Sequence, residues 1–160
     1  AASLRSLQAA EIRINKVHIS CAIEVRGAGN DSDLRAELRQ YIEPRYLHQT
    51  FGRTPDGVVS YLDLDAGLTD RPPETFREAD IWRVHFHVPV DAERIGNLGT
   101  TRAELLAALN VIPELPYAPH LEVETYTWEV LPGGGRTELA TGFARELRAT
   151  QRLLDGLAPA

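Results

Sequence analysis

The stretch WRVHFHVPV, residues 82 to 90, predicts a buried strand that carries two histidines on one face. His85 and His87 are separated by one residue, so in a strand their side chains point to the same side. An unpaired polar group is costly to bury, so these imidazoles must be paired, hydrated or bound to a ligand. The stretch therefore indicates both a sheet and a candidate site on that sheet.

Polar side chains also share one face of other predicted strands. In HLEVETYTW (120–128) the residues on this face include Glu122 and Glu124. KVHISCAIEV (16–25) alternates strictly between an apolar and a polar face, as a half-buried strand does. The remaining strands that we predict are RYLHQTF (45–51), which contains His48, and the hairpin arm VVSYLDL (58–64).

Helices are expected between these strands. Asp31 or Ser32 can cap a helix that runs to about residue 42, before Pro44. Thr101 and Glu104 have the spacing of a capping box, and RTELATGFARELRATQRLLDGL (136–157) predicts a closing helix. Strands that alternate with helices favour βαβ units and a parallel α/β sheet in one domain, residues 1–160.

In a parallel barrel, the second face of each strand points inward and the active site lies at the C-terminal ends of the strands. That position selects His87 over His85 and Glu124 over Glu122, and it assigns His85 and Glu122 a supporting role one layer deeper. Imidazole and carboxylate groups suit a divalent metal such as zinc, manganese, cobalt or magnesium. We therefore expect His87, Glu124 and His48 as metal ligands.

The same prediction extends to catalysis. A carboxylate beside a divalent ion can move protons on a polyol or ketose, so Glu124 is the expected catalytic base. Arg53 and Arg94 lie on predicted loops that would border this site, and we expect them to bind substrate hydroxyls or anions.

Several phrases together resemble one family. RYLHQTFGR, VVSYLDL, WRVHFHVPV, LGTTRAELLAAL and HLEVETYTWEVLP look like the C-terminal part of EboE-type metabolite traffic proteins, across most of residues 15–132. Those proteins belong to the xylose isomerase-like TIM barrels. The resemblance implies a (β/α)8 barrel with a divalent metal at its C-terminal mouth, where His87 and Glu124 match the metal-binding positions and Arg94 matches a substrate-binding arginine.

The length of the chain refines this expectation. A (β/α)8 barrel needs about 250 residues, whereas this chain has 160 and no methionine. We therefore expect the C-terminal half of a TIM barrel, with an incomplete metal site, which pairs with a missing N-terminal half or with a second copy.

Composition excludes some classes of function. The formal net charge of −6 argues against nonspecific nucleic-acid binding. The sequence has no apolar run long enough for a membrane span. Its single cysteine, Cys21, indicates a reducing compartment, and we expect the cytoplasm.

Three functions remain. We favour a metal-dependent isomerase or epimerase that acts on a small sugar-like metabolite. The alternative is a protein that binds or carries such a metabolite without turning it over, as the family's name suggests. A hydrolase of the endonuclease IV type is disfavoured by the acidic charge.

Overall fold

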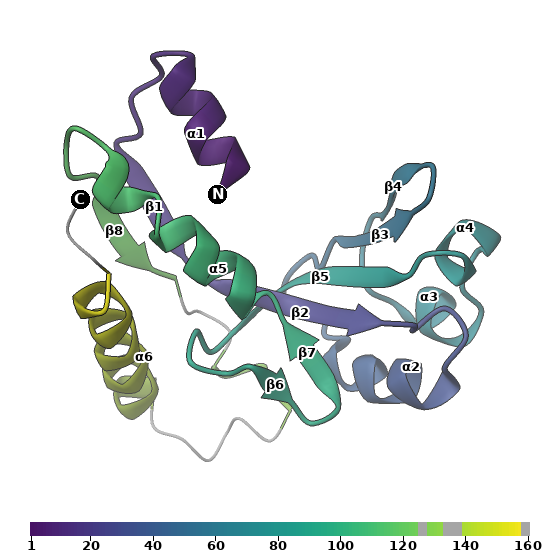
Figure 1. Cartoon of the computed structure of the whole chain (residues 1–160). Coiled ribbons are helices and arrows are strands. Elements are labelled where there is room, and N and C mark those ends of the chain that lie inside the picture. The colour runs from purple at the N-terminus through teal and green to yellow at the C-terminus, as the bar shows by residue number, and fades with distance from the viewer. Residues whose placement is uncertain (125–127, 133–138, 158–160) are drawn as a thin grey trace.

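The computed structural model describes residues 1–124, 128–132 and 139–157. It contains a six-stranded antiparallel sheet in the order β4-β3-β5-β2-β7-β6 and a separate parallel pair, β1 and β8 (Figure 1). The strands are β1 (Lys16–Ile19), β2 (Cys21–Arg26), β3 (Thr50–Thr54), β4 (Gly57–Tyr61), β5 (Ile81–Val88), β6 (Arg94–Ile95), β7 (Leu98–Thr100) and β8 (His120–Val123).

This architecture contradicts the predicted half of a parallel TIM barrel. A parallel neighbour needs a crossover of a dozen or more residues, usually a long helix. Here Pro55 and Asp56 form the turn of the β3–β4 hairpin, and Gly57, with a φ of 138°, is the first residue after that turn. Gly96, with a φ of 60°, lies in the turn that joins β6 to β7. Both turns send the chain straight back beside the strand it has left, so each of these neighbours is antiparallel.

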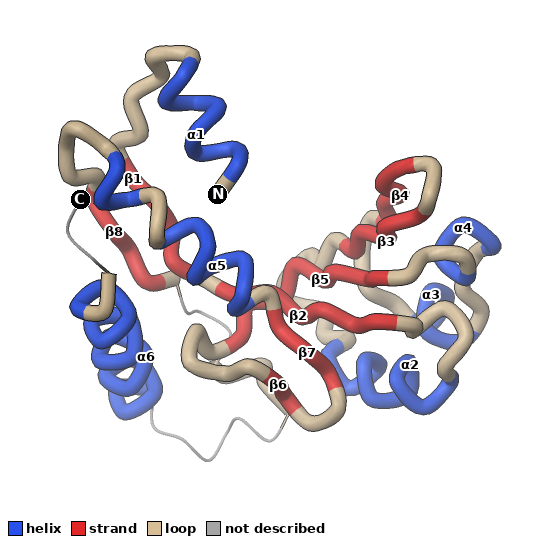
Figure 2. Tube along the Cα trace, in the orientation of Figure 1, coloured by secondary structure: helices blue, strands red, loops and turns tan. Residues whose placement is uncertain are grey.

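The helices fall into two groups, which Figure 2 separates from the strands by colour. One group lies on the right-hand side of the large sheet in Figure 1, and the other lies around the β1–β8 pair and the start of β2. The first group comprises α2 (Ser32–Leu38), the 3₁₀ turn η1 (Arg39–Tyr41), α3 (Ala66–Asp70) and α4 (Glu74–Arg77); the second comprises α1 (Ala2–Ala9), α5 (Arg102–Leu109), η2 (Ile112–Glu114) and α6 (Leu139–Asp155). Within the described ranges, no helix has the length and apolar character needed to cross a membrane.

The core forms where β2 and β5 pair. One face of each strand is apolar and almost fully buried, as the alternating sequence predicts. Trp82 is anchored there, because its indole N–H donates to the Phe76 carbonyl oxygen at 2.8 Å. The buried side chains of this face are Cys21, Ile23 and Val25 from β2, Trp82, Val84, Phe86 and Val88 from β5, and Leu38, Leu68 and Phe76 from the helices.

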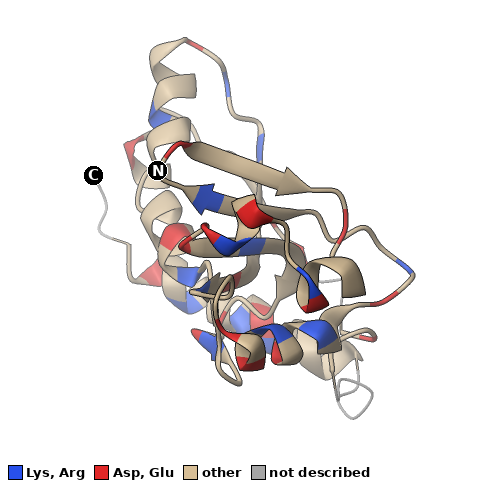
Figure 3. Cartoon of the chain, turned by 90° about the vertical axis from the view of Figure 1, so that its right-hand side faces the viewer, with Lys and Arg blue, Asp and Glu red and all other residues tan. Residues whose placement is uncertain are grey.

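The opposite face of β2 and β5 is charged. Glu24 is buried, and one of its carboxylate oxygens accepts from the Arg83 side chain at 2.7 and 2.9 Å while the other accepts from Arg26 at 2.8 Å. Arg83 also contacts Glu104 from α5. Acidic and basic residues are interspersed along the ribbon (Figure 3). Arg83 thus shares this polar face with the two histidines of β5, as predicted from the alternation.

Two predicted helix starts have different outcomes. The Asp31 carboxylate accepts from the backbone N–H groups of Asp33 and Leu34, which confirms the predicted cap of α2. The predicted capping box of α5 is wrong, because the Thr101 hydroxyl oxygen accepts from the Ala22 N–H at 2.9 Å. That contact joins the start of α5 to β2 instead of capping the helix.

Candidate functional site

Three histidines and a glutamate from three strand segments meet where the small pair joins the large sheet. The His18 Nδ1 lies 2.6 Å from a carboxylate oxygen of Glu124, and the His87 Nδ1 lies 3.3 Å from the Glu124 backbone oxygen. The Nε2 atoms of His85 and His87 are 3.0 Å apart. We call these four residues the histidine cluster.

The fold explains this meeting. β1 pairs with β8 in parallel, with His18 opposite Glu122, and the Glu124 N–H continues the ladder by donating to the Ile19 oxygen. Only Ser20 separates β1 from β2, and in β2 Ala22 lies opposite His87. One extended segment therefore takes part in both sheets and places His18 beside the end of β5.

The hydrogen bonds assign a proton to each ring. A carboxylate or carbonyl oxygen only accepts, so the His18 Nδ1 and the His87 Nδ1 both donate. Burial is the largest effect on His87 and lowers its pKa; the nearby His85 and His18 lower it further, against the opposite effect of Glu124. A neutral His87 then has a lone pair on Nε2, which accepts from the Nε2–H of His85.

The depth of the two β5 histidines is the reverse of the predicted order. His87 is 3% exposed, whereas His85 is exposed at the surface. Glu122, predicted to lie one layer deeper together with His85, instead pairs with Lys16 at 2.9 Å, and this lysine lowers the pKa of Glu122. The depth prediction failed because it assumed the axis of a barrel that is not formed.

His48 lies outside the cluster's side chains but contacts its backbone. The His48 side chain is 1% exposed; its Nε2 is 2.7 Å from the Glu43 carboxylate and its Nδ1 is 3.2 Å from the His85 carbonyl oxygen. Both ring nitrogens therefore face protein acceptors. In this arrangement neither nitrogen points at Glu124, its predicted partner in a metal site.

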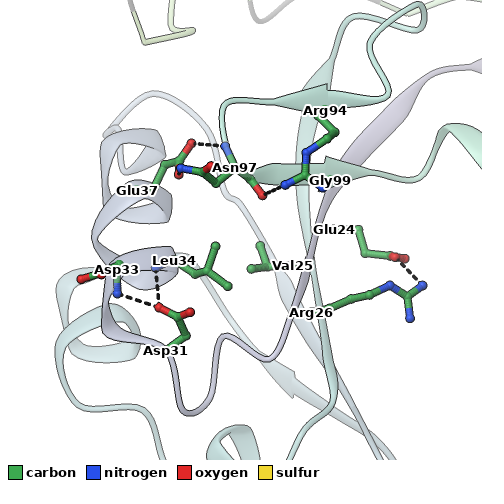
Figure 4. A pocket seen from close by; sticks show the side chains of 10 residues that line it. All are labelled: Glu24, Val25, Arg26, Asp31, Asp33, Leu34, Glu37, Arg94, Asn97 and Gly99. Atoms are coloured by element: carbon green, nitrogen blue, oxygen red, sulfur yellow. Dashed lines mark hydrogen bonds and ion pairs between the residues drawn. The ribbon is translucent and has the colours of Figure 1, made fainter.

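Arg94 lines a cavity of about 450 Å³ beside β2, β7 and α2 (Figure 4). The Arg94 guanidinium donates to the Asn97 carbonyl oxygen, while the Glu37 carboxylate accepts from the Asn97 backbone and side-chain N–H groups at 2.8 and 2.9 Å. The charged residues of the lining are Glu24, Arg26, Asp31, Asp33, Glu37 and Arg94. The volume lies in the range of small-molecule sites, and the lining carries four carboxylates and two guanidinium groups.

Arg53 lies on the outer face of β3, where it pairs with Asp80. The guanidinium lowers the pKa of Asp80. Arg53 also lines a shallow hollow of about 280 Å³ with Phe51 and Val58. The structure thus places Arg53 and Arg94 at two separate surfaces, and neither has a hydrogen bond or ion pair with the histidine cluster.

Metal binding depends on how many ligands converge. The 3.0 Å separation of the His85 and His87 Nε2 atoms is compatible with two ligands of one ion. Among the residues that the structure describes, no group of three or more histidine, cysteine or acidic side chains is arranged to hold a metal. The described residues therefore do not by themselves make up a complete metal site.

Two residues that make these contacts were not predicted. His18 was not among the predicted site residues, yet it is exposed and pairs with Glu124. Glu43 was not singled out, because a loop position next to Pro44 has no periodic signal that would connect it to His48. The alternation of polar and apolar residues along 16–20 was the available signal for His18, whereas only the three-dimensional arrangement reveals Glu43.

No protein-family model, curated protein or solved structure matches the chain. The resemblance to EboE-type proteins therefore stays a prediction from the sequence, and the functional assignment depends on the residues described above.

Proposed function

We propose that this chain acts on a small, polar, sugar-like metabolite by moving a proton, in the manner of an isomerase or epimerase. The observation that supports this proposal is the 2.6 Å contact between His18 and the Glu124 carboxylate, beside the buried His87. The His18 and Glu124 side chains are 44% and 32% exposed, so a ligand in solution can reach them.

The chemistry follows from the hydrogen bonds. With Nδ1 donating to Glu124, the lone pair of a neutral His18 is on Nε2 and can accept a proton from a carbon next to a substrate carbonyl. The Glu124 carboxylate then stabilises the imidazolium that forms and keeps the ring oriented. Loss of that proton leaves an enolate on the substrate. In an isomerisation, the imidazolium returns the proton to the former carbonyl carbon while the hydroxyl proton passes to the other substrate oxygen. In an epimerisation, solvent delivers a proton to the opposite face of the enolate and the imidazolium releases its own proton to solvent. The predicted base, Glu124, thus acts through His18.

Hydrogen exchange with solvent tests this proposal across a range of candidate substrates. The chain is incubated in D₂O with a panel of aldoses, ketoses and their phosphates, and loss of substrate C–H signals is followed by proton NMR. We expect His18→Gln to lower the exchange rate by at least about 100-fold and Glu124→Gln by a smaller factor. Glu122→Gln is the matched control, because Glu122 is on the same strand and pairs with Lys16.

Exchange by the wild type that survives His18→Gln would refute the role of His18. Absence of exchange across the whole panel, together with saturable binding of one compound, would refute proton transfer and support a carrier.

The carrier function is our second candidate, because the Arg94 cavity is large enough for a metabolite and has no hydrogen bond to the histidine cluster. In that case Arg94→Gln should weaken binding about tenfold, by loss of a charge-assisted hydrogen bond, while His18→Gln leaves it unchanged. Isothermal calorimetry with the compound found in the panel separates the two functions. For either candidate we propose the cytoplasm, because the lone Cys21 suits a reducing compartment.

A further inference from the structure

The contact between His48 and the backbone of His85 gives a buried residue a specific effect on the candidate site. His48 is 1% exposed, and its ring stacks at a tilt on Phe86 with centroids 4.6 Å apart. A ligand therefore has no access to it. Any influence of His48 on chemistry must act through the residues that it holds.

Both ring nitrogens of His48 face groups that only accept hydrogen bonds. Nε2 meets a Glu43 carboxylate oxygen at 2.7 Å, and Nδ1 meets the His85 carbonyl oxygen at 3.2 Å. Only the imidazolium donates from both nitrogens. The Glu43 carboxylate is itself oriented by the backbone N–H groups of Arg45 and Tyr46 at 2.7 and 2.9 Å.

The peptide of His85 is held from both sides by this segment. The His85 N–H donates to the Gln49 oxygen at 2.8 Å, while the His85 oxygen accepts from His48. The pairing of β5 with β2 shifts at this point: Ile23 lies opposite Val84, whereas Ala22 lies opposite His87. β2 thus leaves His85 and Phe86 unpaired, so residues 48–49 supply the fixed contacts there.

We infer that Glu43 and His48 form a positioning pair that sets the orientation of His85 against His87. His48 holds the His85 carbonyl, the peptide fixes the direction of the His85 side chain, and this places its Nε2 3.0 Å from that of His87. The orientation of the His85 ring against His87 does not depend on the proposed function. An effect of this orientation on proton transfer does rest on the proposed function.

Two substitutions at His48 separate positioning from simple stability. The amide nitrogen of asparagine occupies the place of Nδ1, so His48→Asn keeps the donor to the His85 oxygen. The amide nitrogen of glutamine occupies the place of Nε2, so His48→Gln keeps the donor to Glu43 and loses the one to His85. The measurement is the nitrogen-15 chemical shifts of the His85 and His87 rings at constant neutral pH, which report tautomer and hydrogen bonding.

In the wild type we expect His87 to show a protonated Nδ1 and an unprotonated, accepting Nε2. His48→Asn should retain this pattern. In His48→Gln, the nitrogen-15 chemical shifts of the two His87 ring nitrogens should lose their separation, because the two tautomers begin to exchange. If Asn loses the separation and Gln retains it, or if both variants retain it, the inference is overturned.

A second pair of variants keeps the test decisive if a His48 variant does not fold. Glu43→Gln can still hold His48 through its amide, so we expect the wild-type shifts; Glu43→Ala releases His48 and should lose the separation. Identical spectra from these two folded variants would overturn the inference. These spectra are recorded without substrate, so a negative hydrogen-exchange experiment in D₂O does not affect what they show. Likewise, spectra that overturn this inference do not decide the role of His18, which the exchange experiment tests.

Discussion

Two histidine–glutamate pairs in the described part of the chain have almost the same length and very different surroundings. His18 and Glu124 are 2.6 Å apart with side chains 44% and 32% exposed, whereas His48 and Glu43 are 2.7 Å apart with side chains 1% and 12% exposed. Water competes for the first pair and screens it, so it contributes little stability but is open to a ligand. The second pair is shielded from water, so removing one partner leaves the other without compensation.

The difference between the pairs predicts a large difference in stability on truncation. His48→Ala should lower the free energy of unfolding by about 3 kcal/mol, because it leaves Glu43 and the His85 carbonyl without their donor. His18→Ala should cost less than about 1 kcal/mol. Urea denaturation at neutral pH measures both. Equal losses from the two variants would show that burial does not distinguish the pairs.

A buried thiol reports the same difference kinetically. Burial is the main reason that the pKa of Cys21 is raised to about 12, so the native thiol is protonated and closed to alkylation by iodoacetamide near neutral pH. If labelling follows opening of the core, His48→Ala should accelerate it about 100-fold and His18→Ala less than about tenfold. Mass spectrometry over time measures the rates. Labelling of the wild type as fast as that of unfolded protein would contradict the buried position of Cys21.

Acid should weaken the buried pair. Burial by itself raises the pKa of Glu43, but the N–H groups of Arg45 and Tyr46 and the His48 ring together outweigh it, so the pKa is lowered. A lowered folded-state pKa contributes stability that is complete above the ordinary glutamate pKa and is lost as the pH falls through the folded value. The stability difference between wild type and Glu43→Gln should therefore shrink between about pH 6 and about pH 3. A constant difference in thermal unfolding over this range would contradict the lowered pKa.

The smallest effect is expected from divalent metals. In both pairs the carboxylate is hydrogen-bonded to a histidine, and among the described residues the two histidine nitrogens closest to each other are the Nε2 atoms of His85 and His87, 3.0 Å apart. Two imidazoles bind zinc more weakly than the three or four ligands of protein zinc sites. Calorimetric titration of this chain with zinc or manganese should show no tight stoichiometric binding. Tight binding at one site, lost in His87→Ala, would indicate that ligands converge on these histidines.

The alternation of apolar and polar residues was enough to predict which residues share a face. The strand at 82–90 corresponds to β5, with Trp82, Val84 and Phe86 in the core and Arg83, His85 and His87 on the opposite face. The hairpin arm that begins near Val58 and the helix after Asp31 were also predicted, because local sequence preferences act wherever the chain folds. The C-terminal part of the strand predicted at 120–128 lies partly outside the described residues.

Strand direction and partner choice could not be predicted in the same way. The period of two residues is identical for parallel and antiparallel neighbours, so alternating strands and helices favoured a parallel barrel that the β3–β4 and β6–β7 hairpins exclude. The shift in register between Ala22 and Ile23 has no signal in the sequence, and it is this shift that leaves His85 to be held by residues 48–49.

The sequence alone determined the residue types, the spacing of His85 and His87 on one strand face, and the polar character of that face, since these follow from covalent order and backbone geometry. Tertiary structure decided that Glu124 contacts His18, that Glu43 contacts His48, and that His87 rather than His85 is buried. Those outcomes depend on which strands pair and in what register, and the pairing is set by packing of the whole core rather than by any local stretch.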